Sequence, residues 1–140
     1  MNLILFVESL ALGPYRTYIA VSGLHEIPDV ATVVYEAKWE GGYSRDDLKV
    51  LYNPILGIYQ VMWHGEEVFS GDKQETIDFL SFTRVIKLNI PDVFVEKKIP
   101  IKVRITVVPS TKVELIDLMI PRLLGYPSSG WQEVIPWRVR

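Results

Sequence analysis

Alternation between aliphatic and polar residues is the feature that most constrains how this chain can fold. Across residues 99–107 every odd position is aliphatic, whereas Lys102, Arg104 and Thr106 occupy even positions. Because successive side chains of a β-strand point to opposite faces, this period of two predicts a half-buried antiparallel strand. Residues 30–39 alternate in the same way.

The residue composition favours strands throughout the chain. Valine and isoleucine together number 31 and alanine only 4, so β-branched residues abound while the strongest helix former is scarce. Short breaks separate further strand-like segments at residues 2–10, 15–21, 48–52, 58–63, 67–69, 77–82, 84–90, 93–96 and 133–139. This pattern predicts a single all-β domain over residues 1–140, a two-sheet antiparallel β-sandwich of immunoglobulin-like or jelly-roll type.

One segment, residues 110–125, fits two structures. Thr111 with Glu114 matches a capping box, and apolar residues follow it at helical spacing. Residues 112–115 also alternate as a strand does. Both alternatives stay open, so the fold prediction includes at most one short helix, near residues 111–120.

The chain contains no cysteine, which excludes disulfides, thiolate nucleophiles, cysteine-ligated zinc and iron–sulfur clusters. Asparagine and glutamine number only three each, a shortage typical of thermophilic proteins. The apolar run at residues 3–7 is too short for a signal peptide, and no run approaches the ~20 apolar residues of a membrane span. We therefore expect no membrane insertion and a cytoplasmic or virion location.

His64 lies beside two glutamates in the stretch YQVMWHGEEVFSG, between two strand-like segments. Gly65 supplies the positive φ that a tight hairpin needs, which predicts a hairpin tip here. The alternative is a metal or proton-transfer site, but a hairpin tip offers at most two good ligands and a catalytic zinc ion typically has three. The other histidine, His25, lies in a polar loop without the second histidine of an HExxH helix. We expect no metal and no cofactor.

No catalytic motif emerges from the remaining sequence. No serine lies in a GxSxG element, and the phosphate-binding patterns GxGxxG and GxxxxGK are absent. Adjacent acids such as Asp46 and Asp47 point to opposite faces of a strand, which is poor geometry for an acid pair. The sequence therefore predicts that the chain is not an enzyme and has no catalytic residues.

Aromatic and basic residues supply a candidate interaction surface. Large rings lie near predicted strand ends and in the YPSSGW loop of residues 126–131, where they either close the core or stack on a sugar or a partner protein. Lys102 and Arg104 project from one face of a predicted strand and can contact phosphates, but an isoelectric point of about 5.7 argues against specific nucleic-acid binding. The predicted surface comprises Trp63, His64, Lys102, Arg104, Tyr126 and Trp131.

Charge is distributed unequally along the chain. Residues 1–83 hold 5 basic and 12 acidic residues, a net charge of −7, whereas residues 84–140 hold 10 and 5, a net charge of +5. If the two halves form opposite faces, copies of the chain attract one another head to tail. If the halves interleave, the charges neutralise within each molecule, and both arrangements are open at this point.

These observations predict a non-catalytic structural or protein-interaction module that assembles with itself, as a homo-oligomer, or with a partner protein. One alternative is a carbohydrate-binding or small-ligand-binding module that uses the loop aromatics. A further alternative is a metal-dependent hydrolase built on His25 and His64.

Overall fold

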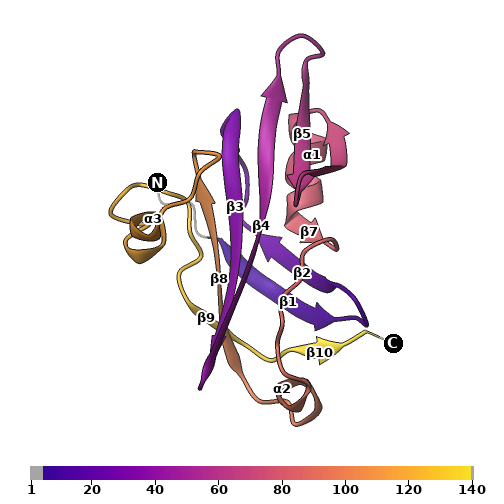
Figure 1. The fold of residues 1–140 in the computed structure, drawn as a ribbon, viewed down its shortest axis with the longest axis vertical. Coiled ribbons are helices and arrows are strands. Elements are labelled where there is room, and N and C mark those ends of the chain that lie inside the picture. Colours follow the sequence, from indigo (N-terminus) through magenta and orange to yellow (C-terminus); the bar gives the residue numbers. More distant parts are fainter. Residues whose placement is uncertain (1–4, 140) are drawn as a thin grey trace.

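Strands predominate in the computed structural model, which describes residues 5–139 and has 47% strand against 14% helix. Figure 1 shows the elements, which follow one another as β1 (Phe6–Leu12), β2 (Thr17–Ser22), β3 (Val30–Trp39), β4 (Gly42–Asn53), β5 (Ile58–Trp63), β6 (Glu66–Gly71), α1 (Lys73–Ser81), β7 (Phe82–Thr83), α2 (Asp92–Glu96), β8 (Ile101–Val108), α3 (Leu115–Met119), β9 (Gln132–Val134) and β10 (Trp137–Arg138). The prediction of a mostly β chain is confirmed.

The strands form two sheets. The larger is antiparallel and has six strands in the order β6-β5-β4-β3-β8-β9, and the smaller has four in the order β10-β1-β2-β7. In Figure 1, β1 and β2 run obliquely across the long strands β3 and β4. Because β1 and β10 pair in parallel, the smaller sheet departs from the antiparallel prediction. The two-sheet, sandwich-like arrangement agrees with the sequence, and the immunoglobulin-like or jelly-roll assignment stays a prediction.

A shared core fills the space between the sheets. Leu10 and Ile19 from the smaller sheet, and Val33, Leu48 and Val103 from the larger one, are all less than 2% exposed. Val33 and Val103 lie on the aliphatic faces that the alternation identified. The inner face of the larger sheet therefore follows directly from the period of two.

Helix α1 occupies the segment predicted as a strand at residues 77–82, so that prediction is wrong. Asp72 Oδ1 accepts a hydrogen bond from Glu75 N at 2.8 Å, and Glu75 Oε1 accepts one from Asp72 N at 3.1 Å. This reciprocal capping box satisfies backbone donors at the helix start. Ile77 and Leu80 are buried, three residues apart, as one face of a helix requires.

The strands predicted at residues 84–90 and 93–96 are also wrong. The second segment belongs to α2, and the first has no regular strand pairing. Three backbone N–H groups of the first segment donate instead to side-chain oxygens of β2 and β4: Lys87 to Asp46 at 2.7 Å, Leu88 to Thr17 at 3.0 Å and Asn89 to Ser44 at 2.9 Å. Since residues 5–139 contain three helices, the prediction of at most one is wrong too.

The ambiguous segment forms the short helix α3, so the helical alternative is the one observed. Its cap is Glu114 rather than Thr111, because Glu114 N donates to Asp117 Oδ2 at 2.8 Å and Glu114 in turn caps the backbone of Asp117. Leu118 packs against Val34 and Val108 on the outer face of β3 and β8. The helix and the loop after it therefore form a cover over that outer face.

This cover changes the environment of the strand at residues 99–107. Arg104 and Thr106, which the alternation placed on a solvent-facing side, are only 8% and 0% exposed, whereas Lys102 stays exposed. The half-buried prediction is wrong for most of β8, because both of its faces are covered.

The strand predicted at residues 133–139 divides at Ile135 and Pro136. Its first part, β9, joins the larger sheet and its second part, β10, joins the smaller one. Proline has no backbone N–H for a strand ladder, which explains why the pairing stops there. Of the strand predicted at residues 2–10, positions 2–4 lie outside the described residues, and β1 begins at Phe6.

Candidate functional site

A buried ion pair lies on the outer face of the larger sheet. Glu36 of β3 and Arg104 of β8 are register partners, and the guanidinium donates from Nε to Oε1 at 2.8 Å and from Nη2 to Oε2 at 3.2 Å. Arg104 Nη2 also donates to the carbonyl oxygen of Leu118 at 2.7 Å, and the Tyr43 hydroxyl donates to Glu36 Oε2 at 2.6 Å. Glu36 is 3% exposed. With every partner in place, this charge pair ties β3, β8 and α3 together.

The ion pair has two consequences for the sequence-based expectations. Arg104 lies inside the molecule, so its predicted place on an interaction surface is corrected. Glu36 comes from the acidic half of the chain and Arg104 from the basic half, and the strands that carry them are adjacent. Both halves therefore contribute strands to the same sheet, and they meet where β3 pairs with β8.

The predicted aromatic residues of the YPSSGW loop are held against the body of the protein. Lys38 Nζ lies 4.0 Å and Arg104 Cζ 4.5 Å from the centroid of the Trp131 ring. The Tyr126 hydroxyl donates to Asp117 Oδ1 at 3.0 Å, and this hydrogen bond is the main reason that the pKa of Tyr126 is raised. Both rings are half-buried.

Asp46, on the inner face of β4, is a second buried carboxylate. Its Oδ2 accepts from Trp63 Nε1 at 2.8 Å and Lys87 N at 2.7 Å, and its Oδ1 accepts from Asp47 N and His64 Nε2, both at 2.9 Å. Asp46 is 7% exposed. Among the described residues, no lysine or arginine side chain forms an ion pair with it. Hydrogen-bond donors alone hold this carboxylate.

The hairpin tip at His64 and Gly65 forms as predicted. Both residues have positive φ, 49° and 83°, as a two-residue type I′ turn requires. The imidazole is 59% exposed and stacks on the Trp63 ring, with the centroids 4.1 Å apart. The hydrogen bonds of this imidazole within residues 5–139 go to Asp46 alone. Thus Trp63 and His64 do come together, as part of the Asp46 network rather than of an open surface.

The two histidines and the acid pair lie apart from one another or are already engaged. Nowhere in residues 5–139 do three His, Asp or Glu residues gather in a geometry that holds a metal ion. His25 lies on the loop between β2 and β3, and His64 lies between β5 and β6. Of the two adjacent acids Asp46 and Asp47, Asp47 forms an ion pair with Arg45, with 3.5 Å between Oδ2 and Nη2.

An exposed apolar surface, which the sequence analysis missed, runs along α3 and the turn after it. Within ten consecutive residues, six large aliphatic residues are exposed by 37% to 83%: Leu115, Ile116, Met119, Ile120, Leu123 and Leu124. We call this set the apolar ridge. Only Leu118 and Pro121 of the same segment are buried. The density of aliphatic residues, higher than a short helix can bury on one face, was the signal available in the sequence.

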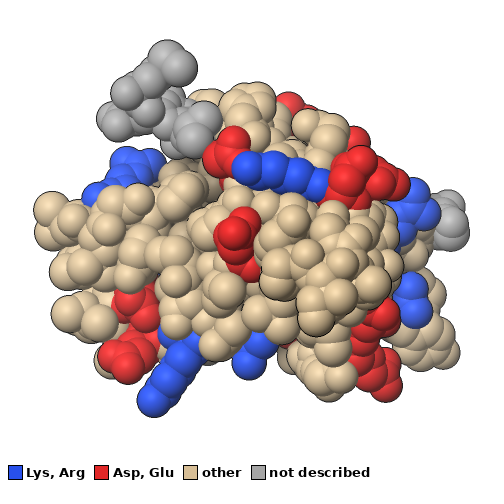
Figure 2. All heavy atoms as spheres, turned by 90° about the horizontal axis from the view of Figure 1, so that it is seen from above, with Lys and Arg blue, Asp and Glu red and all other residues tan. Residues whose placement is uncertain are grey.

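The ridge lies on a weakly charged part of the surface. Figure 2 views the molecule from above, and uncharged residues predominate on the side where α3 lies in Figure 1. Charged residues of both signs stand at the margin of this region. Contiguous exposed apolar surface of this kind is uncommon in monomeric soluble proteins and marks interaction sites.

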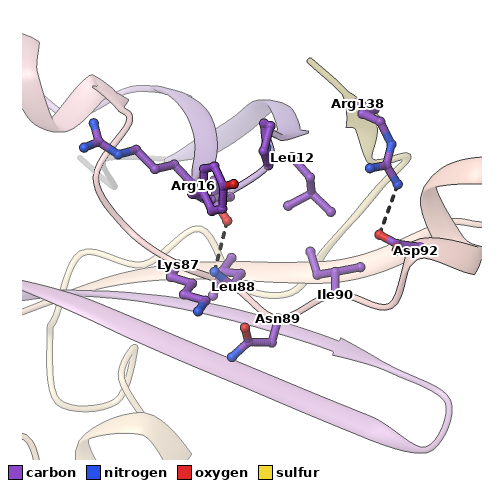
Figure 3. Close-up of a pocket in the computed structure, with 12 residues that line it drawn as sticks. Leu12, Arg16, Lys87, Leu88, Asn89, Ile90, Asp92 and Arg138 are labelled. Carbon is purple, nitrogen blue, oxygen red and sulfur yellow. Dashed lines mark hydrogen bonds and ion pairs between the residues drawn. The ribbon is translucent and has the colours of Figure 1, made fainter. Parts of the chain in front are cut away.

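The hollows on the described part of the surface include a polar one and an apolar one. The polar one, of about 240 Å³, lies between the turn that joins β1 to β2 and residues 87–92. In Figure 3, Arg16 and Arg138 lie at opposite ends of this hollow, and Arg138 is already paired with Asp92 at 3.0 Å. Its cations therefore do not converge on one point where an anion would be held.

The second hollow is apolar and has a volume of about 320 Å³. Its apolar lining comes from Leu5, Leu24, Ile27, Pro28 and Pro127, and His25 and Glu26 are its polar members. Glu26 forms an ion pair with Lys73 of α1. We call this feature the apolar hollow.

No helix within residues 5–139 is long and apolar enough to cross a membrane. In comparisons with known proteins, no family model matches this chain, and neither a curated protein nor a solved structure matches it.

Proposed function

We propose that this chain is a non-catalytic interaction module that associates with a second copy of itself through the apolar ridge. The observation that carries the proposal is the exposure of the ridge: Leu115, Met119 and Leu123 are 77%, 67% and 83% exposed. Stable interfaces have an apolar centre and a polar rim. The ridge and its charged margin have this anatomy.

The ridge is held rigidly, which lowers the entropic cost of binding. Leu118 anchors α3 in the apolar cluster beneath it, and Arg104 binds the Leu118 carbonyl oxygen at 2.7 Å. The capping box of Glu114 and Asp117 fixes the start of the helix. A partner therefore meets a surface that is already ordered.

A second copy fits the ridge because the charges beside it are of both signs. Lys112 and Glu114 precede the apolar residues in the sequence, and Asp117 and Arg122 lie among them. In a two-fold contact the basic residues of one copy face the acidic residues of the other, whereas a rim of one sign repels its own copy. An anionic lipid surface is a poorer partner, because the acidic residues oppose it.

The carbohydrate-binding alternative has less support. It depends on exposed rings at Trp63, Tyr126 or Trp131, and all three are half-buried and engaged in contacts with the rest of the chain. The hydrolase alternative depends on His25 and His64, which lie on different loops.

Light scattering at several protein concentrations tests the proposal. The chain should show a mass above its 16.1 kDa monomer, and the double substitution Leu115→Glu with Leu123→Glu should raise the dissociation constant of the ridge contact at least tenfold. Tyr15→Glu, at an 87% exposed position in the turn between β1 and β2, is the matched control and should leave the mass unchanged. An apolar contact should persist in high salt. A monomer at all concentrations, or a mass that the ridge substitutions do not change, would contradict the proposal.

A further inference from the structure

The tip of the hairpin that joins β4 and β5 is a second exposed apolar feature. Ile55 is 91% and Leu56 64% exposed, and no charged residue lies in residues 53–57. In Figure 1 this hairpin forms the upper end of the long axis of the molecule. The tip therefore projects two aliphatic side chains into solvent.

Hydrogen bonds within the turn hold the tip in one conformation. Asn53 Oδ1 accepts from the backbone N–H groups of Ile55 at 3.0 Å and Leu56 at 3.2 Å, and the Asn53 carbonyl oxygen accepts from Gly57 N at 2.8 Å. Gly57 has a φ of 67°, which a glycine adopts without strain. Because the tip is ordered in advance, inserting it into a cavity costs little conformational entropy.

The apolar hollow lies beside the base of the same hairpin. Pro28 lines the hollow, and the next residue, Asp29, binds both strands of the hairpin. Its carbonyl oxygen accepts from Tyr52 N at 2.7 Å, and its carboxylate accepts from the Tyr59 hydroxyl at 3.0 Å. The projecting tip and the concave hollow are thus neighbouring features at one end of the molecule.

The size and the chemistry of the hollow suit the tip. A dry apolar cavity of about 150 Å³ is enough to bind benzene, and the hollow, at about 320 Å³, is large enough for one or both four-carbon side chains of the tip. Glu26 already has Lys73 as its partner, so insertion leaves no unpaired carboxylate there. The occupant that fits this hollow is an uncharged aliphatic group.

We infer that two copies of the chain exchange their tips, with Ile55 and Leu56 of each copy entering the apolar hollow of the other. Because the tip and the hollow lie near each other, a two-fold axis at this end of the molecule brings each tip toward the hollow of the other copy. This contact shares with the proposed function only the choice of a second copy as partner. The ridge and the tip are separate surfaces, and a chain that uses both assembles beyond a dimer.

Single cysteines test the exchange cleanly, since the natural chain has no cysteine. One variant carries Leu56→Cys and the other carries His25→Cys, at the tip and at the hollow. After mixing and mild oxidation, the disulfide between residues 25 and 56 should form at least tenfold faster than either homotypic disulfide. Tyr15→Cys in place of Leu56→Cys is the matched control and should show no preference for residue 25. Equal rates for all pairs, or equal rates with the control, overturn the inference.

A second measurement separates this contact from the ridge contact. Ile55→Glu with Leu56→Glu should weaken association at least tenfold in light scattering, and it should leave the association through the ridge intact. The 25 to 56 disulfide should form equally well in a chain that carries Leu115→Glu and Leu123→Glu. If the ridge substitutions alone abolish all association and the disulfide preference, the tip exchange is wrong. If instead Ile55→Glu with Leu56→Glu abolishes all association while the ridge substitutions have no effect, the tip exchange stands and the ridge proposal fails.

Discussion

Glu36 and Asp46 are two buried carboxylates on neighbouring strands of one sheet, and the protein satisfies them in opposite ways. Glu36, on the outer face, receives a bidentate guanidinium from Arg104 and a hydroxyl from Tyr43. Asp46, on the inner face, receives N–H groups from Trp63, Lys87, Asp47 and His64 and no Lys or Arg side chain among the described residues. A guanidinium therefore stabilises the Glu36 carboxylate, whereas several hydrogen-bond donors stabilise the Asp46 carboxylate.

The two carboxylates contact different parts of the protein. The outer one fastens α3, a cover with a small apolar cluster of its own. The inner one receives the backbone N–H group of Lys87, which belongs to residues 84–90, a segment that lacks a strand neighbour. A buried acid therefore serves in one region to join elements through a counter-charge, and in the other to accept a backbone N–H that has no strand partner.

Removing the counter-charge should have the largest effect. Arg104→Met leaves Glu36 buried without its guanidinium and should lower the free energy of unfolding by about 4 kcal/mol. Urea unfolding followed by circular dichroism measures this change. The control is Lys102→Met, because Lys102 lies on the same face of β8 but is exposed, and its effect should stay under about 0.5 kcal/mol.

Replacing both members of the pair tests the interpretation of that loss. Glu36→Met together with Arg104→Met removes the uncompensated charge, so it should recover most of the stability. If the double variant is no more stable than Arg104→Met alone, the loss comes from packing and not from the unpaired carboxylate.

Removing the inner carboxylate should have an intermediate effect. Asp46→Ala leaves Lys87 N and Trp63 Nε1 without their acceptor, so the free energy of unfolding should fall by about 2 kcal/mol. Tryptophan fluorescence during urea unfolding reports this change. The neighbouring Asp47→Ala, which removes a surface pair with Arg45, should cost under about 0.5 kcal/mol. Equal losses in the two variants would show that the Asp46 network contributes nothing of its own.

Alkaline pH should produce the smallest effect and should distinguish the two regions. Burial, followed by the hydrogen bond to Glu36, raises the pKa of Tyr43, and burial is the main cause that raises the pKa of Tyr35 near Asp46. The pKa values of Tyr59, chiefly through burial, and of Tyr126, chiefly through its hydrogen bond, are raised as well. These hydroxyls bind their protons more tightly in the folded state. Their contribution to stability is therefore complete below about pH 10, the ordinary tyrosine value, and falls as the pH rises above it.

Absorbance at 295 nm measures this titration. The folded chain should show fewer ionised tyrosines at pH 11 than the chain in guanidinium, in which all seven titrate together. In Tyr43→Phe the alkaline loss of stability should become shallower, because one hydroxyl with a raised pKa is gone. Superimposable curves for the folded and unfolded chains would contradict this prediction.

Sequence reasoning succeeded where local pattern and burial agree. Val33 and Val103 lie on the buried side that alternation indicated, and the His64 and Gly65 turn forms where the glycine permits it. It failed where a tertiary contact reverses the local pattern. The pattern IPIKVRITV predicts a surface position for Arg104, but contacts with Glu36, the α3 segment and the Trp131 ring make it a buried residue.

Tertiary contacts likewise decide which residues of the predicted interaction surface are exposed. Of the six residues predicted to form an interaction surface, Lys102 and His64 are exposed, Trp63, Tyr126 and Trp131 are half-buried, and Arg104 is inside. The apolar ridge escaped notice because apolar residues in a short segment are expected to face the core. Nothing local shows that Leu118 and Pro121 alone satisfy this expectation and that six neighbours face solvent.

The amino-acid sequence by itself determined that the chain is mostly β and that its strands have one apolar and one polar face. Side-chain alternation and β-branched composition are local properties, so they can be recognised without knowing the tertiary contacts. It also excluded cysteine chemistry. Only the tertiary structure decided which outer faces are covered, which carboxylates are buried and which aliphatic residues remain in water. These properties depend on contacts between segments far apart in the chain, such as Glu36 with Arg104 and the hollow that joins Leu24 to Pro127. Local propensities carry no information about such distant contacts, which anchor α3 beneath the apolar ridge and form the apolar hollow.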